Sequence, residues 1–343
     1  MAGDAVSEGL TMELNLANPT GKQLLALYEQ MLLIRRMEEQ LKLDAAQGNL
    51  PGGVHLYIGQ EAIAVGVCSQ LEDTDKITST HRGHGHFLAK GGDPRLMMAE
   101  IWGKRTGICK GMGGSMHVAD FSRGILGANG IVGAGFAIAT GAALSAKLSR
   151  EHRVSVAFFG DGAANQGVFM ESLNISTLWE LPVVFVCEQN HFSEFSPSAT
   201  VTAGQIVDRA RAFNIPSDVI DGNDVLAVAK AAHAAVERAR KDHGPSFIEA
   251  RTYRIQGHFE AEQLFLAGGK YREEQEIEEW RKRDPIDRLK NGMLSGGKAR
   301  AEDFAAIEAR VAGVVAEAVR FAEAGEPADP ELAFDLMFDG QKA

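Results

Sequence analysis

Three short apolar runs, separated by stretches of helical character, limit what this chain can fold into. The runs are VSVAFF (154–159), PVVFVCE (182–188) and SFIEARTY (246–253). Continuous apolar runs of this length are typical of strands buried on both faces of a parallel sheet. A helical stretch lies between the first two runs, and the helix-favouring AVAKAAHAAVERAR precedes the third. The repeated order of strand, helix and strand predicts an α/β fold, with a right-handed parallel sheet flanked by helices.

The segments outside this pattern predict a helical beginning and a helical end. Residues 20–47 carry apolar residues at helical spacing after Pro19, and Thr20 is a suitable N-cap. Residues 302–324 predict an alanine-rich amphipathic helix, and Pro285 is expected to break the charged helix before it. We therefore divide the chain into a loose arm (1–18), an α/β domain (19–285) and a C-terminal helical extension (286–343).

Charge and cysteine content exclude several classes of protein. The 343 residues are 45% apolar and carry a net charge of −11, which argues against nucleic acid as a partner because phosphates must be neutralised by Lys and Arg. We expect no membrane association, since there is no uninterrupted apolar window long enough for a transmembrane helix and no secretory signal. The three cysteines form no CxxC pair, which fits a cytoplasmic protein without a disulfide framework.

The segment GDGAANQG (160–167) places an acidic residue directly after a predicted strand. Ligands of open α/β sheets bind beyond the carboxyl ends of the strands, and a helix beginning near Ala163 would direct free N–H groups to a phosphate there. Asp161 would repel a bare phosphate, so its presence indicates a bridging cation, for which Mg²⁺ is suited. Asn190 ends the next strand and would bring a neutral oxygen to the same edge of the sheet.

Other interpretations of these motifs stay open at this point. A Gly-Asp-Gly sequence after a strand can be only a turn. The P-loop pattern GxxxxGK[ST] is absent, and Asn165 stands where the dinucleotide fingerprint GxGxxG requires its third glycine. The histidines of HRGHGH (81–86) could bind zinc, although Arg82 among them disfavours a dication, and His84 and His86 could simply order the loop.

Taken together, the motifs resemble those of a known family. GDG followed at a distance by Asn190 is similar to the thiamine diphosphate motif. The chain from about residue 20 to 330 resembles the alpha subunits of the decarboxylase components of 2-oxo acid dehydrogenases, and acetoin dehydrogenase alpha subunits are the most similar in motifs. Pyruvate dehydrogenase alpha subunits come next but usually have Tyr where this chain has His81. The motifs that carry the resemblance, in family order, are GGVHLYIGQEA (52–62), THRGHGHFLAKG (80–91), GICKGMGGSMHVAD (107–120), LGANGIVGAG (126–135), GDG (160–162) and TYRIQGH (252–258).

The resemblance implies a thiamine diphosphate-binding fold and a role for each matching residue. Asp161, Asn190 and the carbonyl oxygen of Phe192 would coordinate Mg²⁺. His55 and His258 would be the active-site histidines, which suits a side chain that gives and takes protons near neutral pH. The residues expected to contact thiamine diphosphate are His81, Arg82, Gly130, Val132, Gly160, Gly162, Ala163, Asn190 and His258.

The resemblance also implies partners. The family's alpha subunits lack the pyrimidine-binding half, whose activating glutamate belongs to a beta subunit, so we expect an α2β2 heterotetramer with the cofactor at the α/β interface. The small-residue helix 134–146 would allow close contact there. The substrate of this enzyme would be a small ketone or 2-oxo acid. A lipoyl acyltransferase and a dihydrolipoyl dehydrogenase would be its partner enzymes. A non-catalytic, cofactor-binding scaffold is the alternative from another class.

Three departures from the family pattern bear on the substrate. Gln189 precedes Asn190 where the family often has a second Asn, and HFSEFSPSAT (191–200) replaces a loop that often contains Tyr. The loop AEQLFLAGGKYR (261–272) is longer and more apolar than is usual, which suggests a bulkier or less polar ketone. Phe259 stands where mammalian pyruvate dehydrogenase has a phosphorylated Ser, so that control cannot operate at this position.

Overall fold

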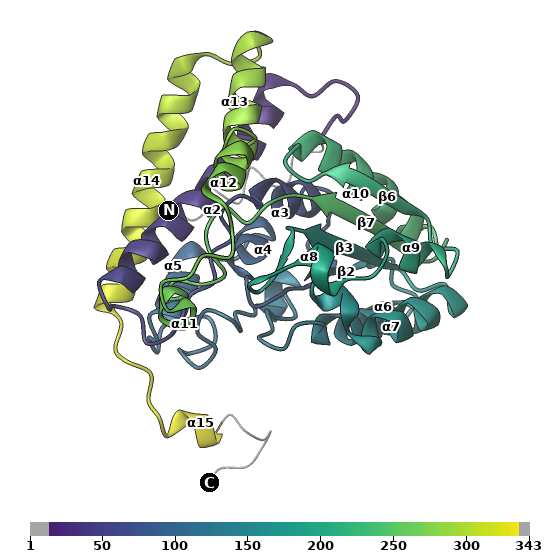
Figure 1. The fold of residues 1–343 in the computed structure, drawn as a ribbon, viewed down its shortest axis with the longest axis horizontal. Helices are drawn as coiled ribbons and strands as arrows, with labels where there is room; N and C mark the ends of the chain where they lie inside the picture. Colours follow the sequence, from purple (N-terminus) through teal and green to yellow (C-terminus); the bar gives the residue numbers. More distant parts are fainter. Residues whose placement is uncertain (1–13, 336–343) are drawn as a thin grey trace.

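The sheet predicted from the apolar runs forms the centre of the molecule. The computed structural model describes residues 14–335, and its main sheet has five strands, all paired in parallel (Figure 1). The three predicted strands are confirmed within one or two residues, and two edge strands were not predicted. In spatial order the strands are β1 (Lys76–Thr78), β2 (Ser155–Gly160), β3 (Val183–Gln189), β7 (Ser246–Arg251) and β6 (Ser217–Asp221).

Helices cover both faces of this sheet, which explains why its strands are continuously apolar. Val156 and Phe158 of β2 belong to a buried cluster shared with α3 (Glu61–Cys68) and α10 (Val225–Arg240). Ala157 and Phe159 point to the opposite face, where their cluster includes residues of the three helices there. Those helices are α6 (Ala134–Leu148), α7 (Gly167–Leu178) and α9 (Ile206–Arg211).

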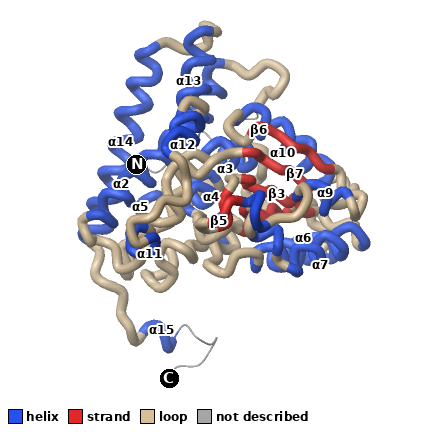
Figure 2. Tube along the Cα trace, viewed as in Figure 1, coloured by secondary structure: helices blue, strands red, loops and turns tan. Residues whose placement is uncertain are grey.

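The long helices at the two ends of the chain lie side by side (Figures 1 and 2). The predicted first helix is α2 (Gly21–Ala46), and the Thr20 hydroxyl accepts a hydrogen bond from the N–H of Gln23, which confirms Thr20 as the N-cap. The predicted last helix is α14 (Ala301–Ala324), which packs against α2 and α5 (Pro94–Ile101). Because α14 contributes to the same buried cluster as the sheet, the boundary after residue 285 stays a prediction.

The break expected at Pro285 is confirmed, because α12 (Glu274–Arg281) ends before it. Pro285 also begins α13 (Pro285–Ser295), where a proline is tolerated because it lacks an N–H that would be unpaired in the first turn. The helix expected near Ala163 begins at Gly167, after a 3₁₀ turn at Ala163–Asn165. Of the predicted arm, residues 14–18 contain no helix or strand and the rest lies outside the described residues, as does the end of the extension.

The remaining elements are short. Between residues 14 and 335, no helix is both long enough and apolar enough to span a bilayer. The short elements are α4 (His84–Ala89), α8 (Ser198–Val201), α11 (Gln263–Leu266), α15 (Leu332–Asp335), a 3₁₀ turn (Phe121–Arg123) and the hairpin of β4 (Phe192–Ser193) and β5 (Ser196–Pro197).

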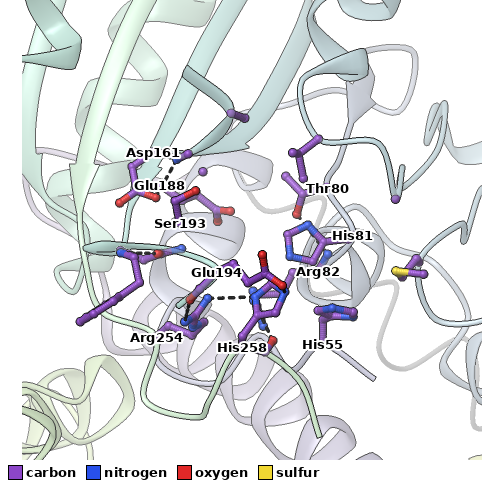
Figure 3. Close-up of a pocket in the computed structure, with 18 of the residues that line it drawn as sticks. His55, Thr80, His81, Arg82, Asp161, Glu188, Ser193, Glu194, Arg254 and His258 are labelled. Atoms are coloured by element: carbon purple, nitrogen blue, oxygen red, sulfur yellow. Dashed lines mark hydrogen bonds and ion pairs between the residues drawn. The ribbon is translucent and has the colours of Figure 1, made fainter. Parts of the chain in front are cut away.

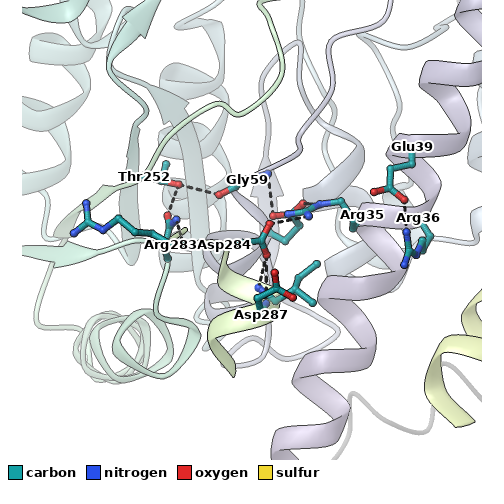
Figure 4. Close-up of polar contacts among 11 residues, drawn as sticks. Arg35, Arg36, Glu39, Gly59, Thr252, Arg283, Asp284 and Asp287 are labelled. Atoms are coloured by element: carbon teal, nitrogen blue, oxygen red, sulfur yellow. Dashed lines mark hydrogen bonds and ion pairs between the residues drawn. The ribbon is translucent and has the colours of Figure 1, made fainter. Parts of the chain in front are cut away.

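An ion-pair group centred on the buried Glu61 carboxylate joins three helices (Figure 4). The Arg35 guanidinium on α2 lies 2.6 Å from Oε1 of Glu61 on α3 and 2.8 Å from Oδ2 of Asp284, the N-cap of α13. The second carboxylate oxygen of Glu61 accepts the N–H of Gly59 at 3.0 Å. The group therefore fixes the start of α13 and the turn before α3 relative to α2.

Candidate active site

A cavity of about 330 Å³ opens at the carboxyl ends of β2 and β3, where ligands of open α/β sheets bind (Figure 3). Every residue that the sequence analysis assigned to the site lines this one cavity, although the residues come from segments far apart in the chain. They are His55, His81, Arg82, Gly130, Val132, Gly160, Asp161, Gly162, Ala163, Asn190, Phe192 and His258. Their individual roles stay predictions.

Oxygen ligands gather at one end of the cavity. Asp161 is buried, accepts hydrogen bonds from the Ser198 hydroxyl and from the N–H of Gly162, and has a raised pKa because of its burial. The Asn190 amide donates to Oε1 of Gln60 at 3.1 Å, which fixes the orientation of its side chain. A carboxylate and an amide oxygen form the kind of donor set that Mg²⁺ accepts, so these residues fit the expected cation.

Gly162 is required at this end by close packing rather than by an unusual backbone conformation. A Cβ atom there would lie 2.4 Å from the Ser193 hydroxyl oxygen, although the φ angle of −62° is open to any residue. The hairpin of β4 and β5 therefore closes directly over the GDG turn, and only glycine leaves room for it.

Two buried guanidinium groups give the other end of the cavity a positive charge. Arg82 donates to the carbonyl oxygens of Leu56 at 2.6 Å and His258 at 3.1 Å. Arg254 donates to the carbonyl oxygen of Glu194 at 2.8 Å and lies 3.2 Å from Nδ1 of His258. Within residues 14–335, neither arginine pairs with a carboxylate, so their charges remain available to an anion.

Three imidazole rings face one another beside these arginines (Figure 3). One nitrogen from each of His55, His81 and His258 lies within 4.8 Å of the others. Burial, followed by the charge of Arg82, lowers the pKa of His55 to about 3 and of His258 to about 2, and the same causes hold the pKa of His81 well below its usual value. The rings are therefore neutral near pH 7.

Unpartnered ring nitrogens mark this cluster as a place for a ligand. Both ring nitrogens of His81 and Nδ1 of His55 are buried without a hydrogen-bond partner in the described structure. Three neutral imidazoles can hold a transition metal, but the charges of Arg82 and Arg254 oppose a dication. The arrangement fits anionic or reacting oxygen atoms better.

His84 and His86 do not converge with His81, so the zinc grouping considered for HRGHGH is not formed. His84 is buried, with Nδ1 at 3.1 Å from the Glu38 carboxylate. The Nδ1 atom of His86 lies 2.8 Å from the Ser79 hydroxyl, and its Nε2 atom lies 3.1 Å from Glu188. Both side chains bind groups inside the protein, in keeping with a loop-ordering role.

One wall of the cavity is organised by a single buried carboxylate. The loop 107–117 wraps around Glu100 of α5, whose two oxygens accept four backbone N–H groups at 2.7–3.1 Å. These belong to Cys109, Gly111, Gly113 and Gly114. The loop then brings Met116 to the cavity, and Nε2 of His117 accepts the N–H of Gly130 at 3.3 Å.

Sequence reasoning missed several residues of the cavity. Arg254 belongs to TYRIQGH, a motif already recognised, but only its histidine was singled out. Glu188 precedes the recognised Gln-Asn pair, and Glu194 lies in a loop that departs from the family pattern. The burial of Arg254, and its lack of a carboxylate partner among the described residues, depend on contacts with segments distant in the sequence. The motif alone could not indicate them.

Comparison with known proteins decides the family. Residues 29–331 match the family model described as dehydrogenase E1 component. The chain belongs to the dehydrogenase E1 component family. Members of this family use thiamine diphosphate, and the predicted family resemblance is confirmed.

Relatives of this E1 chain cover it almost completely. The alpha subunit of acetoin:2,6-dichlorophenolindophenol oxidoreductase from Bacillus subtilis is 50% identical over 326 residues, which is 94% of this chain and 96% of the relative. The protein of the same name from Cupriavidus necator is 44% identical over 327 residues, with the same coverage. The pyruvate dehydrogenase E1 component subunit alpha of Rhizobium meliloti is 39% identical over 313 residues, or 90% and 88% of the two chains. The chain is thus similar to acetoin-type alpha subunits first and to pyruvate-type subunits next.

Proposed function

We propose that this E1 chain is the alpha subunit of a thiamine diphosphate-dependent dehydrogenase that cleaves the C–C bond between the carbonyl and carbinol carbons of an acyloin such as acetoin. The observation that carries the proposal is the convergence of all the expected site residues on one cavity. That cavity has oxygen ligands at one end and two free guanidinium charges at the other. The 50% identity to an acetoin oxidoreductase alpha subunit supports this substrate class over 2-oxo acids.

The donor set of the cavity fits thiamine diphosphate and Mg²⁺. Asp161, Asn190 and the Phe192 carbonyl would hold the cation, and Arg82 would bind the diphosphate through charged N–H donors. The aminopyrimidine would meet the backbone at Gly130 and Val132. The cofactor supplies a nucleophilic carbon and an electron sink for breaking a bond next to a carbonyl.

The protein's own task is to orient the substrate and move protons. His55 and His258 are neutral, so each can accept a proton at one ring nitrogen and return it. Arg254 lies 3.2 Å from Nδ1 of His258, which leaves Nε2 of that ring as the nitrogen available for proton transfer. The surrounding buried side chains limit water around the reacting carbonyl.

The overall reaction balances with a lipoyl acceptor. Acetoin and a lipoyl disulfide give acetaldehyde and an S-acetyl dihydrolipoyl group: one C–C bond and the S–S bond break, and the disulfide is reduced. This makes a lipoyl acyltransferase the expected acceptor and a dihydrolipoyl dehydrogenase the expected reoxidising enzyme. The cytoplasmic location expected from the sequence is part of the same proposal.

The proposal includes a beta subunit in an α2β2 assembly, as the name "subunit alpha" of the relatives suggests. Large apolar side chains are exposed on and beside α6 and α7, where a monomer would leave them in contact with water. They include Ile131, Ile138, Leu178 and Trp179. Burial of this surface against the beta subunit would complete the cofactor site from its open side.

A titration of thiamine diphosphate with Mg²⁺, followed by tryptophan fluorescence, tests the proposal. It is done on this chain alone and on the complex obtained by co-expression with a beta subunit, with turnover of acetoin and pyruvate measured afterwards. We expect tight, saturable binding in the complex and turnover of acetoin in preference to pyruvate. Preference for pyruvate would assign the chain to 2-oxo acids, and absence of binding in both samples would favour a non-catalytic scaffold.

A further inference from the structure

The carboxylate of Glu194 lies beside His258 in the lining of the cavity (Figure 3). Its Oε1 atom is 4.0 Å from Nε2 of the ring, which is too far for a direct hydrogen bond. Glu194 stands at the tip of the hairpin of β4 and β5, in the loop that departs from the family pattern. Because the side chain is 63% exposed, the carboxylate is accessible to a molecule that enters the cavity.

The geometry of the hairpin does not explain why a glutamate stands there. Glu194 is the first residue of the two-residue turn between the paired residues Ser193 and Ser196. Its φ angle is 54°, in the left-handed region that glycine and asparagine adopt more readily than glutamate. Arg254 donates to the Glu194 carbonyl oxygen at 2.8 Å and also contacts the His258 ring. One guanidinium therefore holds the backbone of the glutamate and the imidazole in neighbouring positions.

The contact with Arg254 also determines which nitrogen of His258 carries the proton. A guanidinium has only donors, so Nδ1 of His258, at 3.2 Å, is the acceptor. The neutral ring then carries its proton on Nε2, the nitrogen nearer to Glu194. Nε2–H is a donor and the carboxylate is an acceptor, and the gap between them admits one oxygen atom at about 2.8 Å from each. A hydroxyl group satisfies both, because it can accept from the ring and donate to the carboxylate.

The Glu194 carboxylate differs from the other two carboxylates of the cavity lining. Asp161 and Glu188 each accept a hydrogen bond from a hydroxyl group of the protein, whereas that of Glu194 has no hydrogen-bond donor within residues 14–335. The imidazole and guanidinium groups around it are neutral or positive. Without Glu194, this end of the cavity would favour an anionic substrate.

We propose that Glu194 selects acyloins over 2-oxo acids, because its carboxylate accepts a hydrogen bond from the carbinol hydroxyl and repels a substrate carboxylate. The inference rests on the proposed function and deepens it. Acetoin and pyruvate share an acetyl group and differ at the carbon beside the carbonyl, which carries a hydroxyl in one and is a carboxylate in the other. These oxygens lie on adjacent carbons, so a substrate bound to Nε2 of His258 through either one brings the other close to Glu194. A carboxylate has no proton to donate there, and its charge opposes that of Glu194.

The test measures kcat and KM for acetoin and pyruvate with the enzyme assembled with its beta subunit. Glu194→Gln keeps the size of the side chain and an oxygen acceptor but removes the charge, whereas Glu194→Asp keeps the charge. Glu279→Gln is the matched control, since it removes a carboxylate of similar exposure (60%) on α12, outside the cavity lining. In Glu194→Gln the ratio of kcat/KM for acetoin to that for pyruvate is expected to fall at least about tenfold. Glu194→Asp and Glu279→Gln keep this ratio within about threefold of the wild type.

Binding without turnover provides a second measurement. Pyruvate is titrated by calorimetry into the complex loaded with thiamine thiazolone diphosphate, an unreactive analogue of the cofactor. We expect pyruvate to bind Glu194→Gln at least about threefold more tightly than the wild type, and added salt to reduce this difference because the carboxylate is exposed. Thiamine diphosphate affinity, titrated by fluorescence, stays within about twofold in all variants.

The outcomes separate this inference from the proposed function. An unchanged substrate ratio in Glu194→Gln, an equal fall in Glu279→Gln, or pyruvate binding that is no tighter in Glu194→Gln overturns the role of Glu194 and leaves the proposed function intact. A parallel loss of cofactor affinity in Glu194→Gln also overturns it, in favour of a role in ordering the hairpin. Wild-type enzyme that does not turn over acetoin overturns the proposed function and the role of Glu194 with it.

Discussion

Single residues in the cavity decide which charges it can hold. Asp161 is a buried carboxylate whose pKa is raised by burial. A cation beside it would stabilise the charged form that burial disfavours. Asp161→Ala is expected to weaken Mg²⁺-dependent binding of thiamine diphosphate at least about 100-fold, measured by titration at several Mg²⁺ concentrations. Asp208→Ala, which removes an exposed carboxylate of α9, is the control. If Asp161→Ala retains the wild-type affinity for thiamine diphosphate and Mg²⁺, the assignment of Asp161 as a metal ligand is wrong.

The neutral histidines make the fold sensitive to acid. The pKa of His55 and His258 is far below 6.5 in the folded chain but near 6.5 in the unfolded chain. As the pH falls below 6.5, the unfolded chain binds protons that the folded chain does not, so the free energy of unfolding falls. The loss is up to about 1.4 kcal/mol per pH unit for each histidine.

Urea unfolding at pH 7.5 and pH 5.5 measures this loss. We expect the double variant His55→Gln/His258→Gln to lose clearly less stability than the wild type over this interval, because glutamine does not titrate. Equal losses in the two proteins would show that other groups cause the acid sensitivity.

At the scale of elements, the ion-pair group of Arg35, Glu61 and Asp284 is the contact between helices whose loss by a single substitution is expected to cost the most stability. Arg35→Met leaves the buried carboxylate of Glu61 without its partner, and we expect the free energy of unfolding to fall by about 3–5 kcal/mol. Arg36→Met removes only the exposed pair with Glu39, and its cost is expected to be below about 1 kcal/mol (Figure 4). Equal costs in denaturant unfolding would refute this account.

The sequence predicted those elements whose own residues are enough to identify them as a strand or a helix. Strands β2 and β3 were predicted because burial on both faces requires continuous apolar residues. The edge strands were missed for physical reasons: β1 has only the residues KIT, and β6, with SDVID, is partly exposed and polar. The helix start at Gly167 was misplaced because the residues after the GDG motif first form a short 3₁₀ turn, and the extended backbone of Gln166 separates this turn from α7.

The site shows the same division between local and non-local information. Its contiguous motifs, such as GDG and HRGHGH, were recognisable as sequence, and they meet in one cavity. The lowered pKa values of the histidines and the free charge of Arg254 depend on burial and on groups from distant segments. These properties follow from the folded arrangement and could not be derived from spacing alone.

At the scale of the whole molecule, the exposed apolar surface of α6 and α7 is expected to be an assembly surface. Ile138 is 44% exposed on α6, so Ile138→Glu should prevent stable association with the beta subunit and leave thermal unfolding of the isolated chain nearly unchanged. Leu294→Glu makes a comparable change on α13, far from α6 in Figure 1, and is the control. Size-exclusion chromatography with light scattering measures both, and a heterotetramer with Ile138→Glu would place the interface elsewhere.

The loop 107–117 binds the Glu100 carboxylate of α5 through its backbone N–H groups, as other loops bind a free anion. Its four N–H groups share one acceptor carboxylate, so a movement of the Glu100 side chain would break all four bonds together. We expect the amides of Cys109, Gly111, Gly113 and Gly114 to exchange with deuterium as one set, and independent rates would contradict this. The wall of the cavity would then open and close with the movement of one side chain on a helix that contributes no residue to the cavity lining.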